Sequence, residues 1–116
     1  MNVKKVYEAT GDDCSAVVER FVSEETLSRF IVRFLSDDSF ASLEKAMERG
    51  DVEAAFRAAH TLKGVAQNLG FSALGRSAAT LTEILRLKTF DGSSEPFMRV
   101  SADYDNVVRA IRTYME

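Results

Sequence analysis

Apolar side chains recur every three or four residues along almost the whole chain, and this spacing limits the folds open to it. On an α-helix the spacing gathers the apolar side chains into one stripe, which has to be buried. No segment combines strict alternation with enrichment in β-branched residues, so the sequence predicts no sheet. We therefore expect an all-α fold. One complete stripe comprises Leu27, Phe30, Ile31, Phe34 and Leu35.

Turn and capping residues divide the stripes into separate helices. Gly11-Asp12-Asp13 separates a short helix over residues 2–9 from a second short helix. Further along the chain, polar residues that can accept hydrogen bonds from free amides precede the helices, and glycines follow them. The expected N-caps are Ser23, Asp51 and Ser72, the expected helix ends are Gly50 and Gly70, and the clearest loop spans residues 89–94.

Long amphipathic helices with short connections predict an antiparallel up-and-down four-helix bundle with short N-terminal helices. A length of 116 residues suits one core, so we expect residues 1–116 to form a single helical domain. No apolar stripe is left over for a second copy, which favours a monomer.

Composition and charge argue against several classes of function. The formal net charge is −3 and no run of Lys or Arg forms a basic stripe, so nucleic acid and anionic membranes are not expected partners. No apolar segment approaches the roughly 20 residues that span a bilayer. The single cysteine, Cys14, cannot form an internal disulfide, and this favours a reducing, cytoplasmic location.

The only histidine of the chain, His60, is predicted to lie on the outer face of its helix. At about 100° per residue, the apolar side chains of residues 55–69 centre almost opposite His60. Lys63, Gly64 and Gln67 fall within about 60° of the histidine on the same rotation. These four residues are therefore expected to share one polar strip, which argues against a core histidine but leaves open an exposed histidine without a role.

Gly64 favours a functional strip. A glycine inside a helix costs on the order of 1 kcal/mol relative to alanine. That cost is more readily explained if another molecule has to approach the backbone beside His60. Close packing between helices is the alternative, although Gly64 is predicted to face away from the core. Phe56 lies at the rim of the strip, where it can pack on a neighbouring helix or anchor a docking partner.

The chemistry available to this strip is phosphoryl transfer. An exposed imidazole is partly neutral at physiological pH, and a neutral ring nitrogen can accept a phosphoryl group. Lys63 can place a positive charge near the phosphoryl oxygens, and Gln67 can donate an amide hydrogen bond to them. The sequence has no phosphate-binding glycine loop and no acidic metal cluster, and one histidine alone is a poor metal-ligand set. We therefore expect no metal site and no ATP-binding site in this chain.

The run His60-Thr61-Leu62-Lys63-Gly64, with Ala58-Ala59 before it and Leu69-Gly70-Phe71 after it, resembles the signature of histidine phosphotransfer (HPt) domains. The resemblance extends over essentially the whole chain. It implies a phosphorelay intermediate and not an enzyme with its own ATP site. His60 would accept a phosphoryl group from a receiver-domain aspartate and pass it to another. The implied partners are response-regulator receiver domains and a hybrid sensor histidine kinase, and the required Mg²⁺ would belong to the receiver.

The chain departs from the family pattern on the helix that follows His60. Many members carry Gln, Glu or His there to orient the imidazole, and the corresponding positions here are Ala79 and Thr82. The Thr82 hydroxyl is the possible orienting group, while Glu83 is expected to turn away. Two other functions stay open at this point: an interaction module that binds a receiver or kinase without carrying phosphate, and the substrate domain of a larger histidine kinase.

Overall fold

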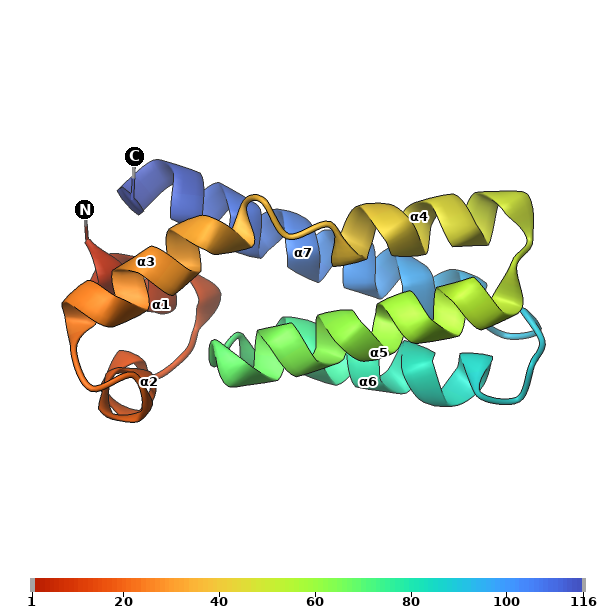
Figure 1. Ribbon diagram of the computed structural model, residues 1–116, viewed down its shortest axis with the longest axis horizontal. Helices are drawn as coiled ribbons and strands as arrows, with labels where there is room; N and C mark the ends of the chain where they lie inside the picture. Colours follow the sequence, from red (N-terminus) through yellow and green to blue (C-terminus); the bar gives the residue numbers. More distant parts are fainter. Residues whose placement is uncertain (1, 116) are drawn as a thin grey trace.

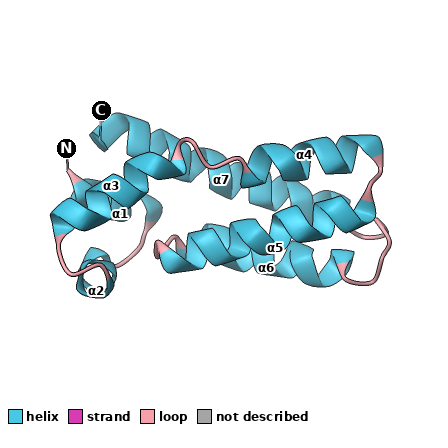
Figure 2. Ribbon diagram, in the orientation of Figure 1, coloured by secondary structure: helices cyan, strands magenta, loops and turns pink. Residues whose placement is uncertain are grey.

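The computed structural model describes residues 2–115, which form helices joined by short connections (Figure 1). Within these residues no strand is present (Figure 2), so the all-α prediction is confirmed. None of the described helices is long and apolar enough to cross a membrane. The helices are α1 (Val3–Thr10), α2 (Cys14–Arg20), α3 (Glu24–Phe34), α4 (Ser39–Arg49), α5 (Val52–Asn68), α6 (Ser72–Leu85) and α7 (Ser94–Met115).

Four long segments build the predicted bundle. α5 packs against both α4 and α6, and α6 packs against α7. α3 lies in front of the C-terminal half of α7 and α4 in front of its N-terminal half, so α3 and α4 together form one side of the bundle (Figure 1). α1 packs on the last turns of α7, and the Asn2 amide donates to the Tyr114 carbonyl at 2.8 Å. The prediction of a four-helix bundle with short N-terminal helices is confirmed.

Most of the predicted helix boundaries are correct. The Ser23 hydroxyl accepts from the Thr26 amide at 3.1 Å, and the Asp51 carboxylate accepts from the Ala54 amide at 3.0 Å. Gly50 ends α4 in the left-handed conformation. The predicted cap at Ser72 is wrong, because Ser72 is already the first residue of α6.

The Ser72 amide instead donates to the Asp12 carboxylate at 3.2 Å. The group that satisfies the start of α6 therefore comes from the connection between α1 and α2, 60 residues earlier in the chain. Capping rules consider only residues close in sequence, so they predict Ser72 as the cap and not the distant Asp12.

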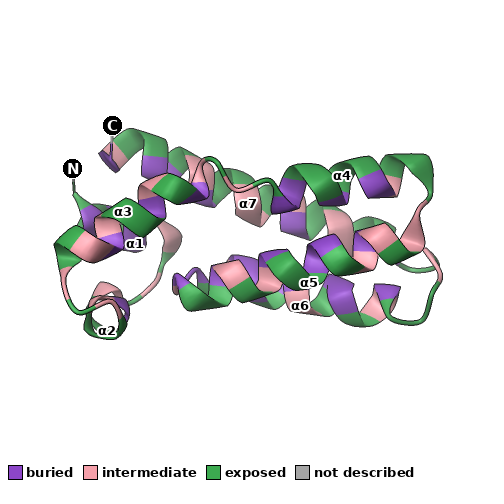
Figure 3. Ribbon diagram, viewed as in Figure 1, coloured by how far each residue is buried: buried purple, intermediate pink, exposed green. Residues whose placement is uncertain are grey.

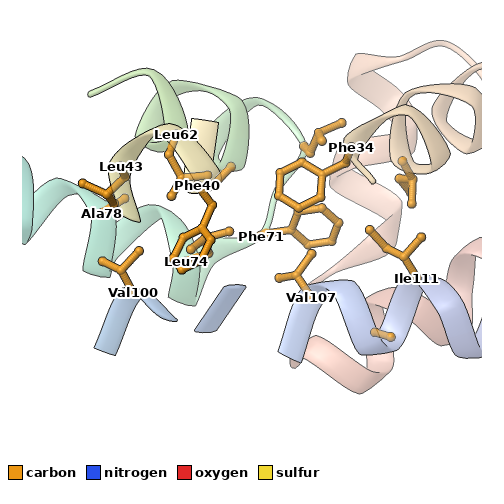
Figure 4. Close-up of a cluster of buried hydrophobic side chains, with 14 of the residues drawn as sticks. Phe34, Phe40, Leu43, Leu62, Phe71, Leu74, Ala78, Val100, Val107 and Ile111 are labelled. Atoms are coloured by element: carbon orange, nitrogen blue, oxygen red, sulfur yellow. The ribbon is translucent and has the colours of Figure 1, made fainter. Parts of the chain in front are cut away.

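The core runs along the bundle axis and is built from the predicted stripes (Figures 3 and 4). Aromatic rings fill the part where the N-terminal helices meet the bundle. Phe71 lies 5.2 Å from Tyr7 and 5.8 Å from Phe34, and Tyr104 stacks on Phe40 at 4.3 Å, all between ring centroids. Phe34 also lies 5.8 Å from Tyr104, so these rings join α1, α3, α4 and α7 to the start of α6.

One residue of the predicted stripe on α3 is not buried. Phe30 keeps 39% of its surface exposed, and Leu35 is only half-buried. The Phe30 ring packs 5.1 Å from Phe21 at the end of α2, and the Arg33 guanidinium lies over its outer face. Phe30 therefore covers the short helix α2 and not the main core, a distinction that depends on where α2 docks.

The N-terminal helices hold the C-terminal end of α5, where the last carbonyls of a helix lack partners within it. The buried Tyr7 hydroxyl donates to the Leu69 carbonyl, and the Arg20 guanidinium donates to the carbonyls of Gln67 and Asn68. Val17 of α2 packs directly on Gly70. Together, α1 and α2 act as a cap for the helix that bears His60.

Substitution at Gly70 tests this contact. Gly70 has a φ of +76°, and a Cβ there would overlap the Cγ2 methyl of Val17. We expect Gly70→Ala to lower the free energy of unfolding by about 2 to 4 kcal/mol, the sum of backbone strain and overpacking. Gly92→Ala is the matched control, because Gly92 has the same φ but open space around it. Gly92→Ala should lower the free energy of unfolding, measured by urea titration, by only about 1 to 2 kcal/mol. Equal losses for the two variants would contradict the Val17 contact.

Tyr7→Phe tests the hydrogen bond to Leu69. We expect a loss of about 1 to 3 kcal/mol at neutral pH, because a buried carbonyl loses its donor. Burial, followed by the charges of Cys14 and Asp12, raises the pKa of Tyr7 above its ordinary value near 10. The folded state thus keeps a proton that the unfolded chain releases, so this contribution is complete below about pH 10 and is lost as the pH rises beyond it.

The measurement is urea unfolding of the wild type and Tyr7→Phe from pH 7 to pH 11. The difference between the two proteins should shrink above about pH 10. Tyr114→Phe is the control, because Tyr114 is only half-buried and no hydrogen bond of its hydroxyl is present among residues 2–115. A constant difference across this range would show that the Tyr7 proton is not held by the fold.

Candidate functional site

His60 projects from the outer face of α5. The helix buries a row of small residues and one leucine against its neighbours, and the opposite face bears the histidine. His60 is exposed, as the helical spacing predicts. Within the described chain, no hydrogen bond to its imidazole is present, so a ring nitrogen is accessible to a partner. The buried residues of α5 are Ala55, Ala58, Ala59, Leu62 and Ala66.

Phe56 links His60 to a cation at the C-cap of α6. The ring of Phe56 meets the imidazole edge-on, with centroids 6.0 Å apart. The guanidinium carbon of Arg86 lies 5.0 Å from the centroid of the same Phe56 ring. Arg86 also pairs with Glu83 on its own helix, with Nη2 3.0 Å from Oε2 and Nε 3.2 Å from Oε1. Four side chains from two helices therefore form one contiguous surface.

The Glu83 carboxyl bonds to Arg86, and the charges around His60 act on it. Hydrogen bonding from Arg86 is the largest cause that lowers the pKa of the Glu83 carboxyl, and the charges of Arg86, Lys63 and His60 act in the same direction. The Glu83 carboxylate faces Arg86, and no hydrogen bond between it and the imidazole is present among the described residues. The i,i+3 spacing of Glu83 and Arg86 was a signal of their ion pair, but not of its closeness to His60.

The antiparallel register of α5 and α6 explains why Arg86 meets Phe56. Gly75 faces Gln67, where a Cβ on Gly75 would lie 3.0 Å from the Gln67 Cγ. Gln67 and Gly75 stand equally far along the chain from Phe71, and so do Phe56 and Arg86. Once the structure places the turn at Phe71, counting outward from it pairs Phe56 with Arg86.

The other residues of the predicted strip lie on the same side of α5. Lys63 is half-buried, while Gly64 and Gln67 are exposed. A Cβ on Gly64 would meet no atom within 4 Å, so packing between helices does not require this glycine. Gln67 lies seven residues from His60, or about 10 Å along the helix axis. The two side chains have to bridge this distance if both are to contact one phosphoryl group.

Thr82 is fully buried beneath the site, and its hydroxyl donates to the Ala78 carbonyl at 2.7 Å. The proton of this hydroxyl is therefore already used inside α6. The described chain shows no hydrogen bond between Thr82 and the imidazole. Its role as an orienting residue stays a prediction, and the group in contact with the His60 ring is Phe56.

A hollow of 330 Å³ continues the site along the α5–α6 surface. Its apolar walls come from Val52, Phe56 and Leu85, and Arg86 and Lys88 stand at its rim. Such a hollow, apolar at the centre and charged at the edge, suits contact with another protein. A larger hollow of 700 Å³ lies between α6 and α7 and contains none of the predicted site residues.

The arrangement offers an exposed nucleophile with cations close by. Lys63 and Arg86 can compensate negative charge that forms on His60. Among residues 2–115, no group of three or more His, Cys, Asp or Glu side chains is placed to hold a metal ion. The chemistry that these residues can perform themselves is therefore the acceptance and release of a charged group at an imidazole nitrogen.

Comparison with known proteins identifies the family. The model of the Hpt domain family matches residues 33–112, which include all of α4, α5 and α6 and most of α7. No curated protein and no solved structure matches the chain. Hpt domains are phosphocarriers that interact with receiver domains and histidine kinases. With a helical bundle and a family match over more than half of its length, the chain belongs to the Hpt domain family and is a phosphotransfer module of two-component signalling.

Proposed function

We propose that His60 is the phosphorylated residue of this module and that it relays a phosphoryl group between receiver-domain aspartates. The observation that supports this most directly is the exposure of the only histidine on the face of α5 that also carries Lys63 and an unobstructed Gly64. A phosphorelay intermediate needs a nucleophile that two different active sites can reach in turn. The imidazole on the outer face of α5 meets that requirement.

In the proposed step a neutral imidazole nitrogen of His60 attacks the phosphorus of a receiver aspartyl phosphate. The P–N bond forms while the P–O bond to the aspartate breaks, and the aspartate leaves as a carboxylate. The proton on the other ring nitrogen passes to solvent, to which the exposed ring has access. The reverse sequence delivers the group to a second receiver. Mg²⁺ is expected on the receiver, where it would neutralise the phosphoryl oxygens.

The neighbours of His60 take the roles that their positions allow. Lys63 stabilises the charge on the phosphoryl group, and Gln67 donates a hydrogen bond to that group or to the docked receiver. Gly64 leaves room for the receiver's active site to approach the helix. Phe56, at the edge of the 330 Å³ hollow, anchors the partner's apolar surface.

His60→Gln tests the site directly. We expect phosphoryl uptake from a panel of phosphorylated receivers to fall to background, because the nucleophile is removed while a polar, exposed side chain remains. The measurement is transfer of acid-labile radiolabel to a chain without a histidine tag. Since His60 is the only histidine, any label with the acid lability of phosphohistidine identifies this residue.

The same assay separates the other functions. Undiminished uptake by His60→Gln would rule out His60 as the acceptor. A wild-type chain that binds receivers but takes up no label would be an interaction module. A chain that is labelled only by the ATP-loaded catalytic domain of a histidine kinase would be a kinase substrate domain.

Gly64→Gln tests the need for close approach. The fold should be unchanged or up to about 1 kcal/mol more stable in urea, because glutamine is the better helix former and the space is open. Phosphotransfer should slow by roughly ten- to hundredfold, since the added side chain displaces the receiver from His60. Gly64→Ala, with a smaller side chain, should give an intermediate rate. Transfer at the wild-type rate in Gly64→Gln would show that the receiver does not need the space beside Gly64.

A further inference from the structure

Arg86 has two negatively charged groups within its range once His60 is phosphorylated. In the free protein it pairs with Glu83 and lies over Phe56, whose ring also contacts the imidazole. Nothing in the family resemblance or in the polar strip assigned Arg86 a role. This inference rests on the proposed function of His60 as the phosphorylated residue.

We propose that Arg86 is an exchangeable cation, which pairs with Glu83 while His60 is free and moves to the phosphoryl group once His60 is phosphorylated. The two states differ in the partner of one guanidinium. Phe56 supports the guanidinium in the first state, and its edge-on contact with His60 keeps the imidazole close by.

The ion pair with Glu83 is weak enough to be exchanged. Both side chains are largely exposed, with relative accessibilities of 51% for Arg86 and 64% for Glu83. Pairs of this kind are screened by water and contribute little to stability. A flexible guanidinium held only by an exposed carboxylate and an aromatic face can therefore change partner without disturbing the bundle.

Phosphorylation provides the driving force. It adds nearly two negative charges and three acceptor oxygens to His60, whose ring meets the Phe56 ring on which Arg86 lies. A guanidinium can bind either a carboxylate or a phosphoryl group with two parallel hydrogen bonds, and the phosphoryl group carries the larger negative charge. Lys63 supplies a single point charge from the other side. The phosphoryl group therefore competes with Glu83 for Arg86.

This exchange has a consequence for the relay. In the phosphorylated state Arg86 stabilises the phosphohistidine, whereas Glu83, having lost its partner, repels it. Arg86 and Glu83 therefore have opposite effects on the phosphotransfer equilibrium. Arg86 shifts the phosphoryl group toward His60, and Glu83 shifts it toward the receiver aspartate. A residue that only helps docking changes the forward and reverse transfer rates by the same factor, so it leaves the phosphotransfer equilibrium unchanged.

The first experiment follows the guanidinium itself. The chain is phosphorylated with phosphoramidate, a small phosphodonor that needs no receiver, and the Arg86 Nε–H signal is recorded by NMR. We expect this signal to shift on phosphorylation of His60 in the wild type. The Arg76 signal is the internal control and should stay in place, because Arg76 lies on the same helix but lines the hollow with α7. An Arg86 signal that does not move while His60 is phosphorylated would refute the exchange.

The second experiment measures the phosphotransfer equilibrium with one receiver, at concentrations where little complex forms. Arg86→Gln should shift it toward the receiver by about two- to fivefold, the range expected for an exposed charge pair. Glu83→Gln should shift it toward His60 by a similar factor. Arg86→Lys, which keeps the charge, should restore part of the loss, and Arg76→Gln should have no effect. An unchanged equilibrium in Arg86→Gln would overturn the proposal.

Failure of this inference is distinguishable from failure of the proposed function. If receivers transfer no phosphoryl group to His60, the proposed function fails, whatever Arg86 does after treatment with phosphoramidate. If transfer occurs but neither the Arg86 signal nor the equilibrium responds, only the exchange is excluded.

Discussion

Close packing of α5 against α6 is the interaction on which the rest of the structure depends. The buried face of α5 is mostly alanine, and α6 presents Gly75 to Gln67 of α5. Small side chains let the two backbones approach closely and fix their antiparallel register. That register buries one face of α5 and leaves the opposite face to His60. It also brings Arg86, from the far end of α6, beside Phe56.

The N-terminal helices stabilise this helix pair from one end. α1 and α2 precede residue 33, where the match to the Hpt family begins. Through Tyr7 and Arg20 they satisfy the last carbonyls of α5, and through Asp12 they satisfy the first amide of α6. The turn that sets the α5–α6 register is thus clamped by residues that lie outside the family match.

The site combines a rigid support with mobile charges. The α5 backbone and the Phe56 ring, packed against the core, give the imidazole a defined position. Lys63, Glu83 and Arg86 surround it with long side chains that can reorient in solvent. A carrier that meets different receivers in turn benefits from this combination. The nucleophile stays in place while the surrounding charges adapt to the presence or absence of a phosphoryl group.

The sequence by itself determined the all-α bundle, most helix boundaries, and the outward direction of His60, Gly64 and Gln67. These features follow from the 3.6-residue period and from local capping, which depend only on neighbouring residues. Only the tertiary structure decided that Asp12 caps α6, that Phe30 covers α2, that Thr82 is buried and bonded to Ala78, and that Arg86, paired with Glu83, lies over Phe56. Each of these depends on contacts between residues distant in the chain or on the register of two packed helices. Such contacts are set by the packing of whole faces, and a local pattern does not contain them.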